Sequence, residues 1–120
     1  MAGGVGLGTA KAIQTANSSG KNIAMFWVDT DGCVSAATYC KYFVTSVEKG
    51  ISESVKTAVL DASKGHGGGS YVGTLQNGGA VLAPFHDYAS KVPASLQSEL
   101  NTVKQQIISG KIVPQTKSPV

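Results

Sequence analysis

The unbroken apolar run Ile23–Val28 constrains the fold more than any other feature of the chain. The run does not alternate between apolar and polar residues, and a polar turn, Asp29–Gly32, ends it. A strand that is covered on both faces has this pattern, whereas a strand with one solvated face alternates. The run therefore predicts a central strand of a parallel sheet.

The segments around this strand predict an α/β fold. Apolar residues recur at rough helical spacing within Gly6–Gly20, and strand-forming residues occupy Tyr42–Val47. Helical spacing returns over Val47–Ser63, and a last helix is predicted over Pro93–Gly110. The order helix, strand, strand, helix, hairpin, helix is typical of an α/β protein with a parallel or mixed sheet between helices.

The hairpin in this order is predicted from Asn77-Gly78, which lies between the runs Ser70–Leu75 and Ala80–Ala83. Asn-Gly between two apolar runs is the strongest short-range hairpin signal, because both central residues of a type I′ turn need a positive φ. We therefore expect the two runs to pair with each other. We also expect the aromatic residues of the two earlier strands to lie in the core; they are Phe26, Trp27, Tyr42 and Phe43.

Composition argues against several classes of protein. With 42% hydrophobic and 14% charged residues, the chain is too apolar to be disordered. The net charge is +3 and all ten basic residues are lysine, which argues against a nucleic-acid partner because arginine usually dominates phosphate recognition. No apolar run approaches the roughly 18 residues that span a bilayer, and the first residues do not resemble a signal peptide. As written, the chain is expected to be cytoplasmic.

The cysteines and histidines do not predict a metal or catalytic site. Cys33 and Cys40 are too few for the usual four-ligand zinc site, and His66 and His86 lie too far along the chain for a zinc-finger spacing. The cysteines are expected to form a disulfide in an exported protein and to remain thiols in a reducing compartment. His86 is expected to make a local hydrogen bond rather than a catalytic pair with Asp87, because adjacent side chains rarely face each other.

Polar residues at the ends of the two predicted strands form the candidate binding site. Asp29 follows the first strand and Lys49 follows the second. If the two strands are parallel, Asp29 and Lys49 share the carboxyl edge of the sheet, where open α/β sheets bind their ligands. Asp29 can accept two hydroxyl hydrogen bonds, as from a ribose diol, and Lys49 can pair with it or donate to a ligand. A turn-capping Asp29 and a solvated Lys49 are the alternatives.

A glycine-rich segment, Gly3–Gly8, opens the chain. A glycine loop that enters a helix presents backbone N–H groups to an anion or a hydroxyl. The segment does not match the dinucleotide fingerprint, because Thr9 stands at the final glycine position, and no Gly-Lys-Ser/Thr follows as in a P-loop. A flexible N-terminus is an equal alternative. The strand that normally precedes such a loop is missing from the chain as written.

Five segments together carry a resemblance to a known family; they are Ala2–Gly8, Val28–Asp31, Val44–Lys49, Gly78–Asp87 and Ser90–Ile112. In this order they resemble successive blocks of the basic membrane protein family. These proteins are substrate-binding lipoproteins of ABC transporters, similar to purine-nucleoside receptors. The resemblance covers only the carboxyl-terminal part of such a protein, over residues 1–113, and residues 114–120 are expected to form a flexible tail.

The resemblance implies a partial type I periplasmic-binding fold and a set of ligand contacts. The backbone of Gly3 and Gly4 would face the ribose. The Asp29 carboxylate would accept hydrogen bonds from the ribose hydroxyls, and Lys49 would complete this polar cluster around the ribose. Asp31 is a further implied contact, at a position where Asp-Gly replaces the commoner Asp-Gln of the family. His86, which lies in another of the matching blocks, is implied to shape the fold.

The function implied by the resemblance is solute binding without catalysis or a cofactor. The ligand would be a nucleoside, with a purine favoured, and the partner of the intact protein would be an ABC permease. The family is extracytoplasmic and anchored by lipid. Without an amino-terminal lobe, the chain would hold about half of the site and expose apolar surface. The alternative is a self-associating structural remnant without a ligand. A nucleotide-handling enzyme is the least favoured reading, because the chain has no P-loop and no acid–base constellation.

Overall fold

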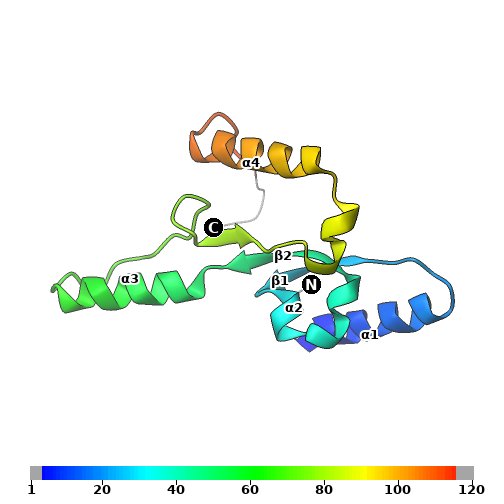
Figure 1. Ribbon diagram of the computed structural model, residues 1–120. Helices are drawn as coiled ribbons and strands as arrows, with labels where there is room; N and C mark the ends of the chain where they lie inside the picture. The colour runs from blue at the N-terminus through cyan, green and yellow to red at the C-terminus, as the bar shows by residue number, and fades with distance from the viewer. Residues whose placement is uncertain (1–3, 116–120) are drawn as a thin grey trace.

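Three strands form a mixed sheet at the centre of the molecule (Figure 1). The computed structural model describes residues 4–115. Strand β1 (Met25–Asp29) pairs in parallel with β2 (Phe43–Lys49), and β3 (Ala80–Leu82) pairs antiparallel with the other edge of β2. The predicted α/β class, with a mixed sheet and two parallel strands, is therefore confirmed.

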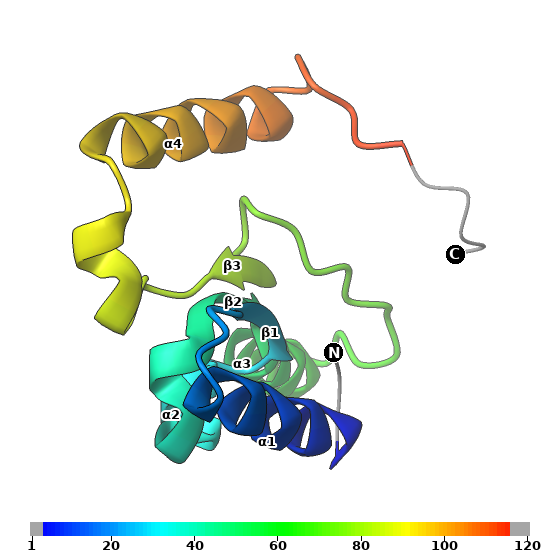
Figure 2. The same ribbon diagram turned by 90° about the vertical axis from the view of Figure 1, so that its right-hand side faces the viewer.

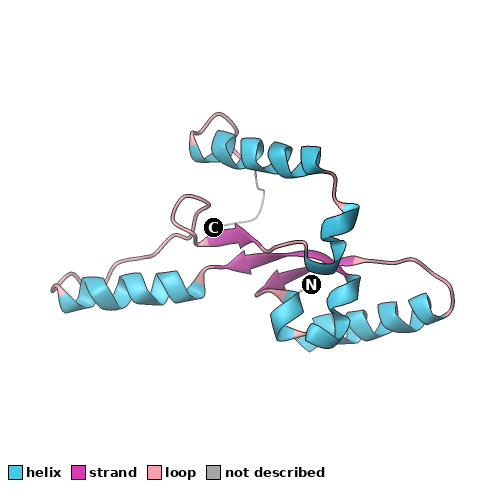
Figure 3. Cartoon of the chain, viewed as in Figure 1, coloured by secondary structure: helices cyan, strands magenta, loops and turns pink. Residues whose placement is uncertain are grey.

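The helices lie on both sides of this sheet and beyond its end (Figure 3). In chain order they are α1 (Gly4–Ser18), α2 (Gly32–Ser35), the 3-10 helix η1 (Ala37–Tyr42), α3 (Ile51–Ser63), the 3-10 helix η2 (His86–Lys91) and α4 (Ala94–Ile108). Figure 2 shows α1 and α2 on one side of the sheet and α4 on the other. None of the helices within residues 4–115 has both the length and the apolar character needed to cross a membrane.

The core lies between the sheet and α1. The rings of Trp27 on β1 and Phe43 on β2 are 5.0 Å apart between centroids, and Ala10 and Ile13 of α1 belong to the same cluster. Gly6 allows α1 to approach the sheet, because a Cβ at this position would lie 2.6 Å from the Trp27 ring. The first turn of α1 is therefore fixed against β1.

The expectation that β1 is a central strand covered on both faces is wrong. Within the described sheet, β1 is an edge strand and β2 is the central one. Met25 and Trp27 are buried, but Phe26 between them is 59% exposed. The core cluster occupies one face of β1, so the alternate side chain reaches solvent. Three of the four aromatic residues expected in the core are buried, and Phe26 is not.

The predicted hairpin is also wrong: a turn forms at residues 75–78, but Asn77 lacks the positive φ that a type I′ turn requires. Gly78 has a φ of 73°, and the Asn77 side chain accepts from two backbone N–H groups of the same turn. Residues 70–75 are not a strand, and β3 pairs with β2 instead. The buried Thr45 hydroxyl donates to the carbonyl of Ala83 at 2.7 Å, which holds the segment after β3 against β2.

Several predicted boundaries also change. Val47 belongs to β2, and α3 begins only at Ile51, after Gly50. The last helix begins at Ala94, next to the predicted start at Pro93. Of the predicted flexible tail, residues 116–120 lie outside the described residues.

Helices α3 and α4 contribute no buried residue to the core. Helix α3 extends beyond the sheet in Figure 1, and its Val55 and Val59 are 55% and 61% exposed. The radius of gyration is 17.3 Å, whereas a compact domain of this length has about 14 Å. The fold therefore exposes apolar surface, as the resemblance to part of a larger protein implies.

Candidate functional site

Asp29 and Lys49 are the last residues of two neighbouring parallel strands. The register pairs Asp29 with Glu48, so both carboxyl ends lie at one edge of the sheet. The Nζ atom of Lys49 lies 2.6 Å from Oδ1 of Asp29. The predicted shared edge, and the pairing of these two side chains across it, are confirmed.

The backbone of Asp29 is held in an uncommon conformation. Its φ is 77°, in the left-handed region that non-glycine residues seldom occupy. The side chains of Lys49 and Asp29 are 70% and 33% exposed, and an exposed ion pair of this kind typically contributes less than about 1 kcal/mol. The pair therefore adds little to stability, while a positive φ at a partly buried polar residue supports the hypothesis of a functional role for Asp29.

The described part of the glycine-rich segment, residues 4–8, is helical. Helix α1 begins at Gly4, which contradicts the expected loop, and Gly3 lies outside the described residues. The first N–H groups of any helix have no acceptor within it. Because Gly6 packs on Trp27, the first turn of α1 lies close to the strand that ends at Asp29. The predicted contact of the Gly3 and Gly4 backbone with a ligand stays a prediction.

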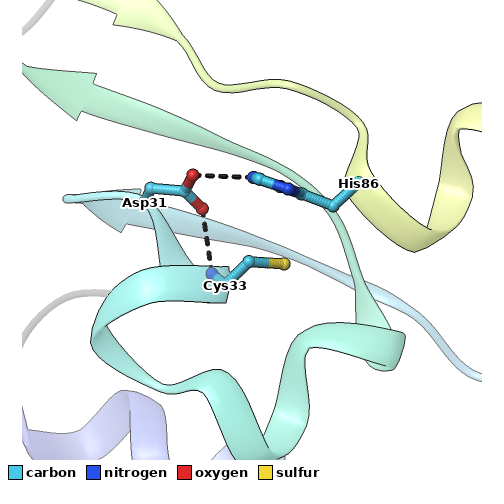
Figure 4. Close-up of side chains that lie close together, drawn as sticks. All are labelled: Asp31, Cys33 and His86. Atoms are coloured by element: carbon cyan, nitrogen blue, oxygen red, sulfur yellow. Dashed lines mark hydrogen bonds and ion pairs between the residues drawn. The ribbon is translucent and has the colours of Figure 1, made fainter.

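Asp31 is held by two partners (Figure 4). Its Oδ1 accepts from the backbone N–H of Cys33 at 2.9 Å, which caps α2, and its Oδ2 lies 2.7 Å from Nε2 of His86. The side chain of Asp31 is only 15% exposed. Asp31 therefore fixes the turn that follows Asp29, and its predicted contact with a ligand stays a prediction.

Sequence reasoning missed the long-range partner of His86. The prediction of a local hydrogen bond for His86 is wrong, because its partner Asp31 lies 55 residues away along the chain. Sequence spacing also indicated no metal site, whereas the ligand atoms of Asp31, Cys33 and His86 all lie within 4.8 Å of one another. No local pattern signals this cluster, since the return of the chain after β3 brings His86 to Asp31.

A disulfide links α2 to η1. Cys33 and Cys40 are bonded to each other, which is the oxidised alternative that the sequence left open. His66 is exposed, as its glycine-rich surroundings indicate.

Ser46 on β2 supports the turn from within the core. Its side chain is fully buried, and its Oγ accepts from the backbone N–H of Gly32 at 2.9 Å. Gly32 itself has no room for a side chain, because a Cβ would lie 2.7 Å from the Phe43 ring. The turn after Asp29 is therefore anchored by both a hydrogen bond and a close approach.

Replacing Ser46 with alanine is expected to lower the free energy of unfolding by about 1–3 kcal/mol, because the buried N–H of Gly32 loses its acceptor. Urea denaturation measures the change. The matched control is Ser63→Ala at the exposed end of α3, which is expected to change stability by less than about 0.5 kcal/mol. Equal losses in the two variants would show that Ser46 does not anchor the turn.

Neither a scan against protein-family models nor a search of the curated proteins finds a match for this chain.

Proposed function

We propose that the chain forms part of a nucleoside-binding protein, in which Asp29 accepts hydrogen bonds from the ribose hydroxyls. The observation that carries the proposal is the Asp29–Lys49 pair, with 2.6 Å between Oδ1 and Nζ, at the carboxyl ends of two parallel strands. This edge is where open α/β sheets bind their ligands.

The chemistry of the pair suits a vicinal diol. An ionised carboxylate accepts hydrogen bonds through two oxygens and donates none, so Asp29 complements two adjacent hydroxyl donors. Lys49 has three N–H donors on a flexible and largely exposed side chain. It can keep its contact with Asp29 while it donates to a ligand oxygen. Both residues are held by the sheet rather than by a loop, which favours a preformed site.

The resemblance supports the same assignment. Asp29 lies in one of the matching segments and Lys49 in another, at the positions implied to contact ribose. We propose that the three-stranded sheet belongs to a type I periplasmic-binding fold and that the intact protein delivers its nucleoside to an ABC permease. In this proposal the protein binds and releases its ligand without chemical conversion. The turn held by Asp31 orients Asp29 within the site.

A thermal-shift titration with purine and pyrimidine nucleosides tests this proposal. A nucleoside at 100 times its dissociation constant is expected to add about 2.7 kcal/mol, or roughly 10 °C in Tm. Asp29→Asn is expected to raise the dissociation constant about 10- to 100-fold, because a charge-assisted hydrogen bond contributes about 1.5–3 kcal/mol.

The matched control is Asp61→Asn on the exposed surface of α3, which is expected to leave the titration unchanged. The proposal fails if no nucleoside shifts Tm. It also fails if the Asp29→Asn and Asp61→Asn variants bind the nucleoside with equal affinity.

A self-associating protein without a ligand is the second candidate, and the exposed apolar face of α3 favours it. Val55 and Val59 lie one helical turn apart and are each more than half exposed. Analytical ultracentrifugation distinguishes the two candidates. Self-association predicts a dimer that the double substitution Val55→Lys and Val59→Lys dissociates and that Asp29→Asn leaves intact. A monomeric wild-type chain would contradict this candidate.

A further inference from the structure

We propose that reduction of the Cys33–Cys40 disulfide creates a zinc site from the two thiolates, the Asp31 carboxylate and the His86 imidazole. The ligand atoms of Asp31, Cys33 and His86 already lie within 4.8 Å of one another (Figure 4). Cys40 offers a fourth donor next to this cluster, because its sulfur is bonded to that of Cys33. This site is separate from the Asp29–Lys49 pair and does not depend on nucleoside binding.

The donor set suits zinc better than other common metals. Structural zinc sites have four tetrahedral ligands drawn from thiolate, imidazole and carboxylate groups. Calcium and magnesium prefer oxygen ligands alone, so two sulfurs and one nitrogen select against them. With zinc–sulfur bonds of about 2.3 Å, tetrahedral donor atoms lie about 3.3–3.8 Å apart. Zinc binding therefore requires the ligand atoms of Asp31, Cys33 and His86 to draw closer together. It also requires the sulfur of Cys40 to separate from that of Cys33 and to move into the fourth position.

The neighbouring contacts already orient two of the ligands. The backbone N–H of Cys33 holds Oδ1 of Asp31, which leaves Oδ2 directed at Nε2 of His86. A metal ion between these two atoms would replace their direct hydrogen bond. The carboxylate oxygen that remains bound to the Cys33 N–H would keep the ligand in place, as outer hydrogen bonds do in known metal sites.

The redox state of the cysteines controls the site. A dithiol reductant supplies two electrons and two protons to the disulfide and is itself oxidised to a disulfide. Zinc then binds both sulfurs as thiolates, and the two thiol protons pass to solvent. In the oxidised chain the sulfurs are not thiolates, so only Asp31 and His86 remain as ligands. Tight binding is therefore expected only after reduction.

Cobalt(II) is the probe for this site, because it occupies tetrahedral zinc sites and is coloured. The full chain is titrated with Co²⁺ under anaerobic conditions, once with the disulfide intact and once after reduction with a phosphine that is then removed. The reduced chain is expected to bind one Co²⁺ with sulfur-to-cobalt charge-transfer bands and intense visible bands, and Zn²⁺ is expected to displace it. The oxidised chain is expected to show neither set of bands.

Four substitutions separate the proposed site from binding by the cysteine pair alone. His86→Gln and Asp31→Asn are each expected to weaken Co²⁺ binding by the reduced chain at least about 10-fold. The matched controls, His66→Gln and Asp87→Asn, are expected to bind like the unsubstituted chain. Circular dichroism records whether each reduced chain is folded. An unfolded chain that bound metal through its cysteines alone would be insensitive to the His86 substitution.

The proposal is overturned if the reduced chain gives no charge-transfer bands. It is equally overturned if oxidised and reduced chains bind Co²⁺ alike, or if His86→Gln and His66→Gln bind with equal affinity. Loss of nucleoside binding in the Asp29→Asn variant would leave these results unchanged, because Asp29 is not a ligand of the proposed metal site.

Discussion

Replacing Phe43 with alanine is expected to lower the free energy of unfolding by about 3–5 kcal/mol, which is a large fraction of the stability of a domain of this size. The Phe43 side chain is 1% exposed and packs against Trp27, with 5.0 Å between ring centroids. The backbone of Gly32 closes the space beside the ring. Removing the ring therefore leaves a cavity between Trp27 and the backbone of Gly32. Urea denaturation followed by Trp27 fluorescence measures the loss.

Phe26→Ala is the matched control, because it removes the same side chain from the neighbouring strand. Phe26 is 59% exposed, so its loss is expected to cost less than about 1 kcal/mol. The contrast between the two variants tests whether the core lies on one face of β1. Similar losses for Phe26→Ala and Phe43→Ala would mean that both faces of the strand are covered.

Removing the disulfide is expected to lower the free energy of unfolding by about 2.5 kcal/mol in the double variant Cys33→Ser and Cys40→Ser. The bond joins residues with a sequence separation of 7, and closing a loop of that length reduces the entropy of the unfolded chain by about this amount. The corresponding fall in Tm is roughly 10 °C. Calorimetry with a chelator present measures it, since the chelator prevents metal binding from compensating in reduced samples.

The control for the disulfide prediction uses the same double variant. A reductant is expected to lower the Tm of the unsubstituted chain toward that of the double variant, and to leave the double variant unchanged. A reductant that lowered both equally would show that the effect does not come from this bond. An unchanged Tm in the double variant would show that the bond adds nothing to stability.

The sequence predicted the parts of the fold that depend on local pattern and on one general rule. An apolar run, strand-forming residue types, helical spacing and flanking glycines identify β1, β2 and the long helices, because each pattern lies within a single element. The pairing of Asp29 with Lys49 follows from the rule that parallel strands place their carboxyl ends at one edge. That rule needs the two strands to be parallel, which an α/β fold favours, so the central pair of the candidate site was predictable on that assumption.

The features that the sequence did not predict depend on contacts between distant segments. Phe26 belongs to an apolar run, but a run does not show which face of a strand its neighbours cover. Asn77-Gly78 carries a strong hairpin signal, yet residues 80–82 pair with the edge of β2 rather than with residues 70–75. His86 meets Asp31 only because the chain returns past β2 after β3. Each of these outcomes depends on a competing partner elsewhere in the chain.

The central claim is that the carboxyl ends of β1 and β2 bind a nucleoside through its ribose hydroxyls, and an NMR titration of the isotopically labelled chain tests it most directly. The two ligands are a purine nucleoside and the matching 2′,3′-dideoxynucleoside, which lacks the two adjacent ribose hydroxyls that Asp29 is proposed to bind. We expect the nucleoside to shift the backbone amides of Asp29 and Lys49 and their neighbours, with saturation, while the dideoxynucleoside leaves them unmoved. Equal shifts with both ligands, or no shift at these residues with either, would contradict the claim.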